Sequence, residues 1–92
     1  MATVIIPTPL RKFTNQTAKL QVDAGTVGEV IEKITSDFPE LKKHLLDGKG
    51  VLRSFVNVFY GDEDIRDLQA ERTPVQQSSI ISIVPAIAGG VN

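Results

Sequence analysis

One segment has the residue spacing of an amphipathic helix, and it constrains the fold more than any other feature of the sequence. Its apolar side chains recur at intervals of three and four residues: Val27, Val30, Ile31, Ile34 and Phe38. Thr26 and Glu29 fit a capping box, in which Thr26 accepts a first-turn N–H and Glu29 reaches back to the Thr26 N–H. Pro39 disfavours helical geometry at Phe38, so we expect the helix to end there. A single helix of about three turns must bury its apolar side against another element, here one face of a sheet.

Four further segments have the composition of β-strands, and they flank the expected helix on both sides. They are residues 3–6 (TVII), 18–22 (AKLQV), 54–60 (SFVNVFY) and 78–84 (SSIISIV). β-branched and aromatic residues are enriched in strands, and Pro7 and Pro85 stop the first and the last of these segments. The second segment alternates between apolar and polar side chains, which is typical of a half-buried strand. We expect the first two segments to form an antiparallel hairpin.

Two smaller apolar groups complete the pattern. Leu41, Leu45 and Leu46 indicate a helical turn or two, and Ile65 and Leu68 indicate a short edge strand and a turn. The main elements therefore follow the order ββαββ. The sequence predicts an α+β domain in residues 1–85, with a mixed sheet of four to five strands and one main helix packed on one face. Residues 86–92 are expected to form a flexible C-terminal tail.

The alternation of the last two long strands predicts an apolar patch on the face of the sheet that the helix leaves open. Successive side chains of a strand point to opposite faces. The side chains expected to face the helix are Val56, Val58, Tyr60, Ile81 and Ile83. Because one helix covers one face, the open face should present Phe55, Phe59, Ile80 and Val84. An exposed apolar patch marks a partner-binding surface; the alternative is a loop that folds back and covers it.

The residue inventory argues against the common catalytic and metal-binding chemistries. The chain has no cysteine and a single histidine, His44, so it has neither a thiolate nor a pair of imidazoles for a metal. The acidic run of residues 62–64 lacks the spacing of a calcium loop and lies where a hairpin turn is expected. We therefore predict no catalytic residue, no metal and no cofactor. A net charge of -1 does not favour nucleic acid, and no apolar run is long enough to cross a membrane, so we expect a cytoplasmic protein.

The last predicted strand is followed by a short stalk and two adjacent glycines, in the stretch PAIAGGVN. Glycine loses more backbone entropy on ordering than any other residue, so Gly89 and Gly90 are poor choices for a packed terminus. Without Cβ atoms, however, they can pass through a narrow channel and bring a backbone carboxylate to the active site of another protein. Ala86, Ile87 and Ala88 would then connect the domain to the glycines.

Taken together, the element order, the capped helix, the open apolar face and the Gly-Gly pair resemble the ubiquitin-like β-grasp proteins. Within that superfamily, the chain is similar to the small sulfur carriers of the MoaD/ThiS group. The stretches PTPLRKFTNQTAKLQVDAGTVGEVIEKITSDFPEL and IVPAIAGG carry this resemblance over most of the chain. The stretch FVNVFYGDEDIR, together with VPAIAGG, is similar to the CysO-type carriers of cysteine biosynthesis.

The resemblance implies a mechanism in which a partner supplies the chemistry. An E1-like adenylating enzyme of the MoeB/ThiF type would use ATP and magnesium to adenylate the carboxylate of Gly90, and sulfur would replace AMP to give a thiocarboxylate. The thiocarboxylate would donate sulfur to a biosynthetic acceptor, such as a cysteine-synthase-like protein. By position, Ile87, Ala88 and Gly89 would enter the partner's channel, and Val84 would contact the partner beside the tail.

Val91 and Asn92 depart from the family pattern, because carriers in active form end at the second glycine. The resemblance implies a precursor that a JAMM-type metalloprotease cuts between Gly90 and Val91; a cloning remnant is the alternative. Three rival functions stay open: the small, MoaD-like subunit of molybdopterin synthase, a ubiquitin-like protein modifier, and an interaction domain with a disordered tail. The sequence does not rank the acceptor pathways, which include cysteine, molybdopterin, thiamine and secondary metabolites, and it leaves the sulfur source and the oligomeric state open.

Overall fold

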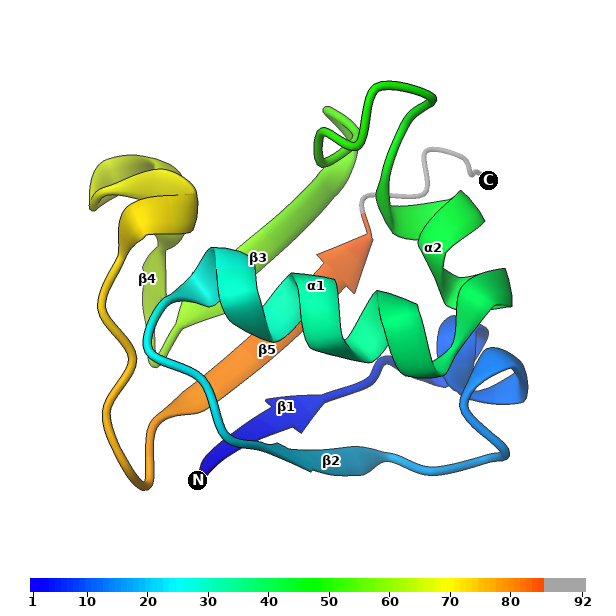
Figure 1. Ribbon diagram of the computed structural model, residues 1–92, viewed down its shortest axis with the longest axis horizontal. Helices are drawn as coiled ribbons and strands as arrows, with labels where there is room; N and C mark the ends of the chain where they lie inside the picture. Colours follow the sequence, from blue (N-terminus) through cyan, green and yellow to red (C-terminus); the bar gives the residue numbers. More distant parts are fainter. Residues whose placement is uncertain (86–92) are drawn as a thin grey trace.

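Five strands form one mixed sheet in the computed structural model, which describes residues 1–85 (Figure 1). They are β1 (Ala2–Ile5), β2 (Lys19–Val22), β3 (Val56–Tyr60), β4 (Glu63–Asp64) and β5 (Ile80–Pro85). Their order across the sheet is β2-β1-β5-β3-β4. β1 pairs antiparallel with β2 and parallel with β5, and β3 pairs antiparallel with both β4 and β5. The predicted mixed sheet is confirmed, and so is the hairpin of its first two strands.

Within residues 1–85, two α-helices follow the first hairpin: α1 (Val27–Asp37) and α2 (Pro39–Leu45). α1 crosses one face of the sheet, and α2 packs near the C-terminal end of α1 (Figure 1). Three short 3-10 helices in the same part of the chain cover Thr8–Phe13, Ile65–Asp67 and Ala70–Arg72. The observed order is therefore ββααβββ rather than ββαββ. The additional helix is the expected turn or two around Leu41 and Leu45. The additional strand is β4, which lies before the position expected for a short edge strand; Ile65 begins a 3-10 helix instead, because the Asp64 side chain accepts the Arg66 N–H and caps that helix.

The start of α1 is fixed by a cap that differs in one bond from the predicted capping box. Thr26 Oγ1 accepts the backbone N–H of Glu29 at 3.2 Å, as expected. Glu29 Oε1, however, accepts the N–H of Gly25 at 2.8 Å, not that of Thr26. Next to this cap, Thr26 forms an isolated β-bridge with Pro74, and the Val27 N–H donates to the carbonyl of Thr73 at 3.0 Å. The chain before β5 therefore shares in capping the helix.

The core lies between α1, α2 and the sheet. Its most buried large apolar side chains, each at most 2% exposed, come from β1 and the residue after it, both helices, β3 and β5: Val4, Ile6, Val27, Val30, Ile34, Leu41, Leu45, Val58, Ile81 and Ile83. The first turn of α1 also packs closely on the 3-10 helix Ala70–Arg72. A Cβ at Gly28 would lie 3.1 Å from the carbonyl oxygen of Glu71, so a larger residue there would push the two elements apart.

Several predicted boundaries move by one or two residues. β1 begins at Ala2 and ends at Ile5, whereas residues 3–6 were expected. β5 begins at Ile80 rather than at residue 78, because the Ser79 N–H closes a turn onto the carbonyl of Gln76 at 3.1 Å. The connection between β1 and β2 contains a 3-10 helix whose Leu10 is buried. No helix among residues 1–85 combines the length and the apolar character needed to cross a membrane.

Candidate functional site: the open face of the sheet

β3 and β5 carry apolar side chains on both faces of the sheet. The four that face the helices are each at most 4% exposed: Val56, Val58, Ile81 and Ile83. On the other face, Ile80 is 50% exposed and Val84 is 44% exposed. These values confirm the predicted alternation of the two strands. Tyr60 is half-buried against the core, and its hydroxyl oxygen lies 2.8 Å from Ser79 Oγ.

The two phenylalanines predicted for the open face have different surroundings. Phe55 is 46% exposed but lies in the turn before β3, not in the strand as predicted. The reason is that the Val56 N–H donates to the carbonyl of Arg53 at 3.0 Å, which closes a turn and delays the strand. Phe59 lies within β3 and is half-buried, because Ser82 of β5 and Asp64 of β4 pair with it on either side.

Four side chains on three neighbouring strands form what we call the open-face patch: Ile5, Phe59, Ile80 and Val84. Ser82 lies at its centre, because it pairs with Ile5 of β1 on one side and with Phe59 of β3 on the other. Ile80 and Val84 lie two residues before and after Ser82 on β5. Ile5, which is half-buried, was not predicted for this face, because the apolar run TVII conceals the alternation. The parallel pairing with β5 is what assigns Ile5 to this face.

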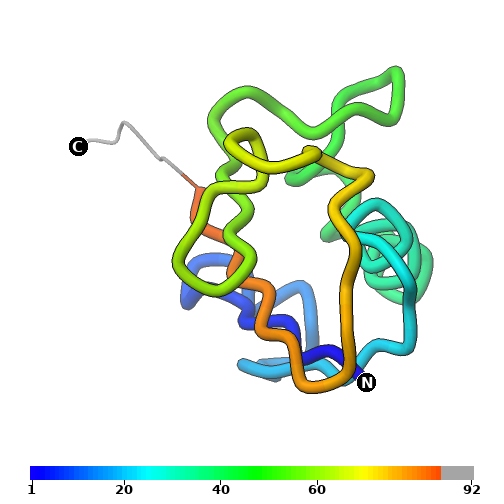
Figure 2. The backbone as a smooth tube through the Cα atoms, turned by 90° about the vertical axis from the view of Figure 1, so that its left-hand side faces the viewer, coloured from blue at the N-terminus to red at the C-terminus, as the bar shows by residue number. Residues whose placement is uncertain are grey.

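The open-face patch lies beside the point where the chain leaves the sheet. β5 ends at Pro85, which pairs with Val56 at the start of β3. Figure 2 shows α1 on one side of the strands and the end of β5 away from it. The residues predicted to enter a partner or to be cleaved, Ile87, Ala88, Gly89, Gly90 and Val91, lie outside the described residues. Their roles, and partner binding by the patch, stay predictions at this point.

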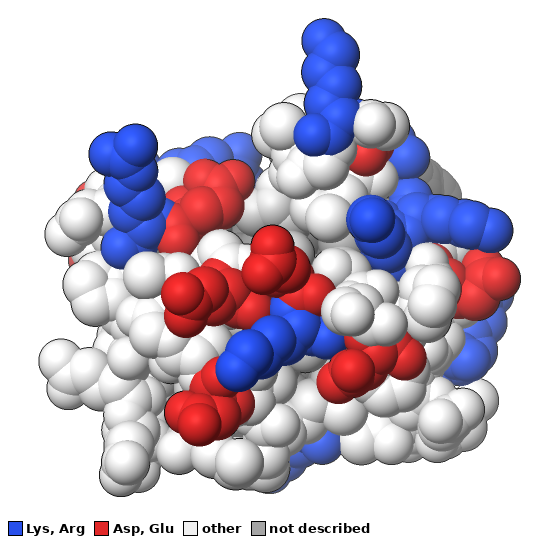
Figure 3. Space-filling model, in the orientation of Figure 1, with Lys and Arg blue, Asp and Glu red and all other residues white. Residues whose placement is uncertain are grey.

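The side of the molecule that carries α1 is charged rather than apolar. Figure 3 shows acidic and basic side chains close together over this side. On α1 itself the exposed charged residues are Glu29, Glu32, Lys33 and Asp37. Lys33 Nζ donates to the backbone carbonyl of Asp23, which ties one of these charges to the chain before the helix. A polar outer stripe of this kind is typical of a helix that faces solvent.

The other residues that could have carried chemistry have structural roles. His44 is exposed, and its ring stacks on Phe13 with the two centroids 4.2 Å apart. In the acidic run of residues 62–64, Asp64 Oδ1 accepts the N–H of Arg66 at 2.8 Å and so caps the 3-10 helix Ile65–Asp67. Across residues 1–85, no group of three potential ligands is placed to hold a metal ion.

The pKa of the Asp47 carboxyl group is lowered, and the cause is local. The backbone N–H groups of Val51 and Lys49 donate to Asp47 Oδ1 at 3.1 and 2.8 Å. Both bonds favour the charged carboxylate, so they lower the pKa of Asp47 below its ordinary value. This turn fixes the loop between α2 and β3, and it has no place in the open face.

The fold and the open face define a class of protein before any particular relative is considered. A mixed five-stranded sheet with its main helix across one face is the ubiquitin-like β-grasp fold, and similarity to solved structures of this fold confirms the predicted fold class. The chain belongs to the ThiS family, whose family model matches residues 4–90.

The relatives of the chain include carriers and modifiers. It is 33% identical over 90 residues to the sulfur carrier protein CysO of Mycobacterium tuberculosis, with 96% of this chain and 97% of that protein covered. A chain in the crystal structure of the Amycolatopsis orientalis BexX/CysO complex is similar with a TM-score of 0.87 and 33% identity, covering 98% of this chain and all of that one (100%). Small archaeal modifier protein 1 from Methanosarcina acetivorans has a TM-score of 0.85 and 26% identity, covering 97% of this chain and 95% of that one.

Proposed function

We propose that this chain is a sulfur carrier protein that carries sulfur as a thiocarboxylate on Gly90. The observation that carries the proposal is the extent of the family match, which runs from residue 4 to Gly90 and stops before Val91. The similarity to CysO over nearly the whole length of both proteins supports the same role. The open-face patch supports it in a second way, because a carrier needs a surface by which another protein recognises it.

In the proposed reaction, the bonds change at the Gly90 carboxyl group. A carboxylate oxygen attacks the α-phosphorus of ATP, and pyrophosphate leaves, so that Gly90 becomes an acyl adenylate. A sulfide sulfur then attacks the carbonyl carbon, and AMP leaves with the bonding electron pair. The product is a thiocarboxylate, which can transfer its sulfur to an acceptor. Gly89 and Gly90 suit this step because they have no Cβ to obstruct a narrow channel.

The chain contributes the carboxylate, and its partners contribute the catalysis. We assign no catalytic residue and no cofactor to this protein, because ATP and magnesium belong to the E1-like adenylating enzyme. Any residue joined to Gly90 by a peptide bond removes the carboxylate that this enzyme needs. Val91 and Asn92 must therefore be cut off first, and we assign that step to a JAMM-type metalloprotease that cleaves between Gly90 and Val91.

The acceptor that we favour is an enzyme of cysteine or related sulfur-metabolite biosynthesis. The support is the similarity to CysO, both in sequence and in the chain of the BexX/CysO complex. The similarity to small archaeal modifier protein 1 supports a second candidate, a ubiquitin-like modifier that forms isopeptide bonds with lysines. A MoaD-like subunit of molybdopterin synthase would differ from both by forming a stable complex with a large subunit.

The experiment that tests the proposal compares the full chain with a 1–90 chain. Each is incubated with an E1-like enzyme, ATP, magnesium and sulfide, and its intact mass is measured. Only the 1–90 chain should gain the mass that corresponds to replacing one oxygen by sulfur, and a JAMM-type protease should restore the gain to the full chain. Equal sulfur loading of the uncut chain at Asn92 would contradict the precursor assignment. Lysine-linked conjugates in place of a free thiocarboxylate would favour the modifier.

A further inference from the structure

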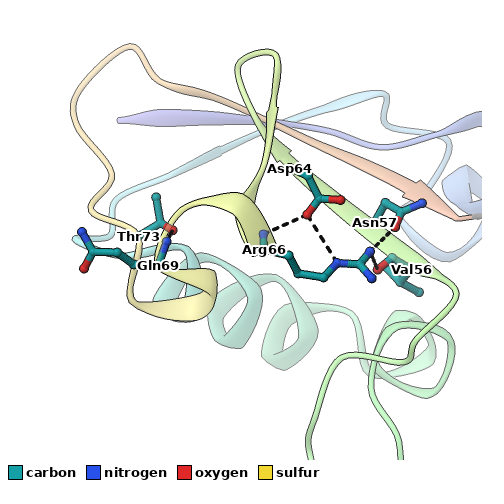
Figure 4. Close-up of polar contacts among 6 residues, drawn as sticks. All are labelled: Val56, Asn57, Asp64, Arg66, Gln69 and Thr73. Atoms are coloured by element: carbon teal, nitrogen blue, oxygen red, sulfur yellow. Dashed lines mark hydrogen bonds and ion pairs between the residues drawn. The ribbon is translucent and has the colours of Figure 1, made fainter.

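One motif of the sequence has not been explained by the proposed function. The stretch FVNVFYGDEDIR contains Asn57, Asp64 and Arg66, and the structure brings these three side chains together at the edge of the open face (Figure 4). Arg66 Nη2 donates to Asn57 Oδ1 and, at 3.5 Å, to the carbonyl of Val56. Arg66 Nε donates to Asp64 Oδ1 at 3.4 Å. Three acceptors from β3 and β4 therefore hold one guanidinium group.

The guanidinium is held in place but remains accessible. The Arg66 side chain is 54% exposed, whereas that of Asp64 is 24% exposed. Among residues 1–85, Nη1 makes no hydrogen bond, so that the two N–H groups on this nitrogen are available to another molecule. A planar guanidinium binds a carboxylate through two parallel hydrogen bonds. Because the group is already ordered by its three acceptors, such a contact costs less side-chain entropy than one made by a free arginine.

Arg66 also lies beside the strand pair at which the chain leaves the sheet. Its two acceptors on β3 are Asn57, which pairs with Val84, and Val56, which pairs with Pro85. The cation is therefore separated from Val84 by Asn57 of β3, and it lies at the rim of the open-face patch near the end of β5. A surface with several exposed apolar side chains and an arginine at its rim fits a partner that presents an apolar side chain next to a carboxylate.

Basic and acidic side chains are mixed along this edge of the sheet. From residue 53 to residue 72 the sequence has three basic residues, Arg53, Arg66 and Arg72, and five acidic ones: Asp62, Glu63, Asp64, Asp67 and Glu71. Of the three arginines, Arg66 is the one that Asn57 and Asp64 hold at the open face. A partner carboxylate that approaches this edge is attracted by Arg66 and repelled by the acidic residues.

We propose that Arg66, held by Asn57 and Asp64, is a specificity-determining anchor that binds an acidic side chain of the enzyme that activates the carboxylate of Gly90. This inference rests on the proposed function and extends it, because it names a contact of that enzyme outside the apolar patch and the tail. Arg66 acts by positioning the carrier, and it does not touch the reacting atoms.

The test uses the E1-like enzyme that loads the wild-type 1–90 chain with sulfur. Calorimetric titration at several salt concentrations measures the Kd between this enzyme and each variant of the 1–90 chain. Arg66→Ala should raise Kd roughly 10- to 100-fold. Arg66→Lys should restore part of the affinity, because it keeps the charge and loses the two-bonded geometry. Arg72→Ala, which removes the same charge from an exposed arginine of another element, should leave Kd unchanged.

The salt dependence separates binding from a structural role. The Kd of the wild-type chain should rise with salt, and Arg66→Ala should reduce that slope, whereas a variant that only loosens the β4 region would keep it. If Arg66→Ala binds as tightly as wild type, or if Arg66→Lys binds as weakly as Arg66→Ala, the assignment of Arg66 as an anchor is wrong. Sulfur loading of the wild-type 1–90 chain would still support the proposed function as a sulfur carrier. If no E1-like enzyme loads the wild-type 1–90 chain, the proposed function fails, and this inference fails with it.

Discussion

At the scale of single residues, Val84 and Phe59 show why two side chains on one patch are not equally useful probes. Both lie on the open face, but Val84 is 44% exposed, whereas Phe59 is half-buried between Ser82 and Asp64. Truncating or charging Phe59 therefore removes packing within the sheet as well as surface. A charge at position 84 should therefore leave stability nearly unchanged, whereas a charge at position 59 should lower it.

Replacing Val84 by aspartate should weaken the complex with the activating enzyme by about 2 kcal/mol or more, because it places a charge in a contact that excludes water. The melting temperature should change little, since the side chain lies outside the core. Gln21→Glu adds the same charge on the same face, two strands away on β2, and serves as the control. Calorimetric titration and thermal unfolding check both. Unfolding of Val84→Asp would show that the Val84 side chain is not outside the core. Equal weakening by Gln21→Glu would show that the open-face patch is not the contact.

At the scale of elements, α1 is the part of the fold that local sequence determines most completely. Its apolar spacing, the Thr26 cap and the end before Pro39 are all as predicted. The details that differ come from contacts with distant residues. The first turn of α1 is bonded to Thr73 and bridged to Pro74, and these residues lie almost fifty positions further along the sequence.

Removing the Thr26 cap tests how much the start of α1 contributes to the stability of the domain. Thr26→Ala deletes the oxygen that accepts the Glu29 N–H, so the free energy of unfolding should fall by about 1 kcal/mol. For a domain of this size, that loss corresponds to a melting temperature lower by roughly 4–8 °C. Thr26→Ser keeps the hydroxyl and should retain most of the stability. If the two variants melt alike, the side-chain bond contributes nothing and the bond from Val27 to Thr73 is sufficient.

The difference between local sequence patterns and contacts with distant residues explains which parts of the fold and the site could be predicted. Alternation assigned Ile80 and Val84 to the open face, because β5 keeps its two-residue period through the polar Ser82. Ile5 could not be assigned, because its strand is apolar at successive positions and its face depends on pairing with β5. Arg66 could not be assigned either, since its contact with Asn57 joins two segments whose register the sequence does not reveal.

At the scale of the whole molecule, the sheet order connects the two ends of the described chain. β1 and β5 pair in parallel at the centre of the sheet, so the first strand supports the strand that leads into the tail. All buried core residues in the described part of the chain lie between Ala2 and Ile83. Recognition by the open face and the reaction at Gly90 are therefore assigned to separate parts of the protein, joined at Pro85.

This separation predicts that a 1–85 chain recognises the activating enzyme but cannot react. It should melt within a few degrees of the full chain, because it retains all of the described core. It should also inhibit sulfur loading of the 1–90 chain competitively, as measured by intact mass at increasing concentrations of either chain. The matched control is the 1–85 chain with Val84→Asp, which should fold and inhibit weakly. A folded 1–85 chain that does not inhibit would show that recognition depends on residues 86–90, and that the open-face patch and Arg66 contribute little to it.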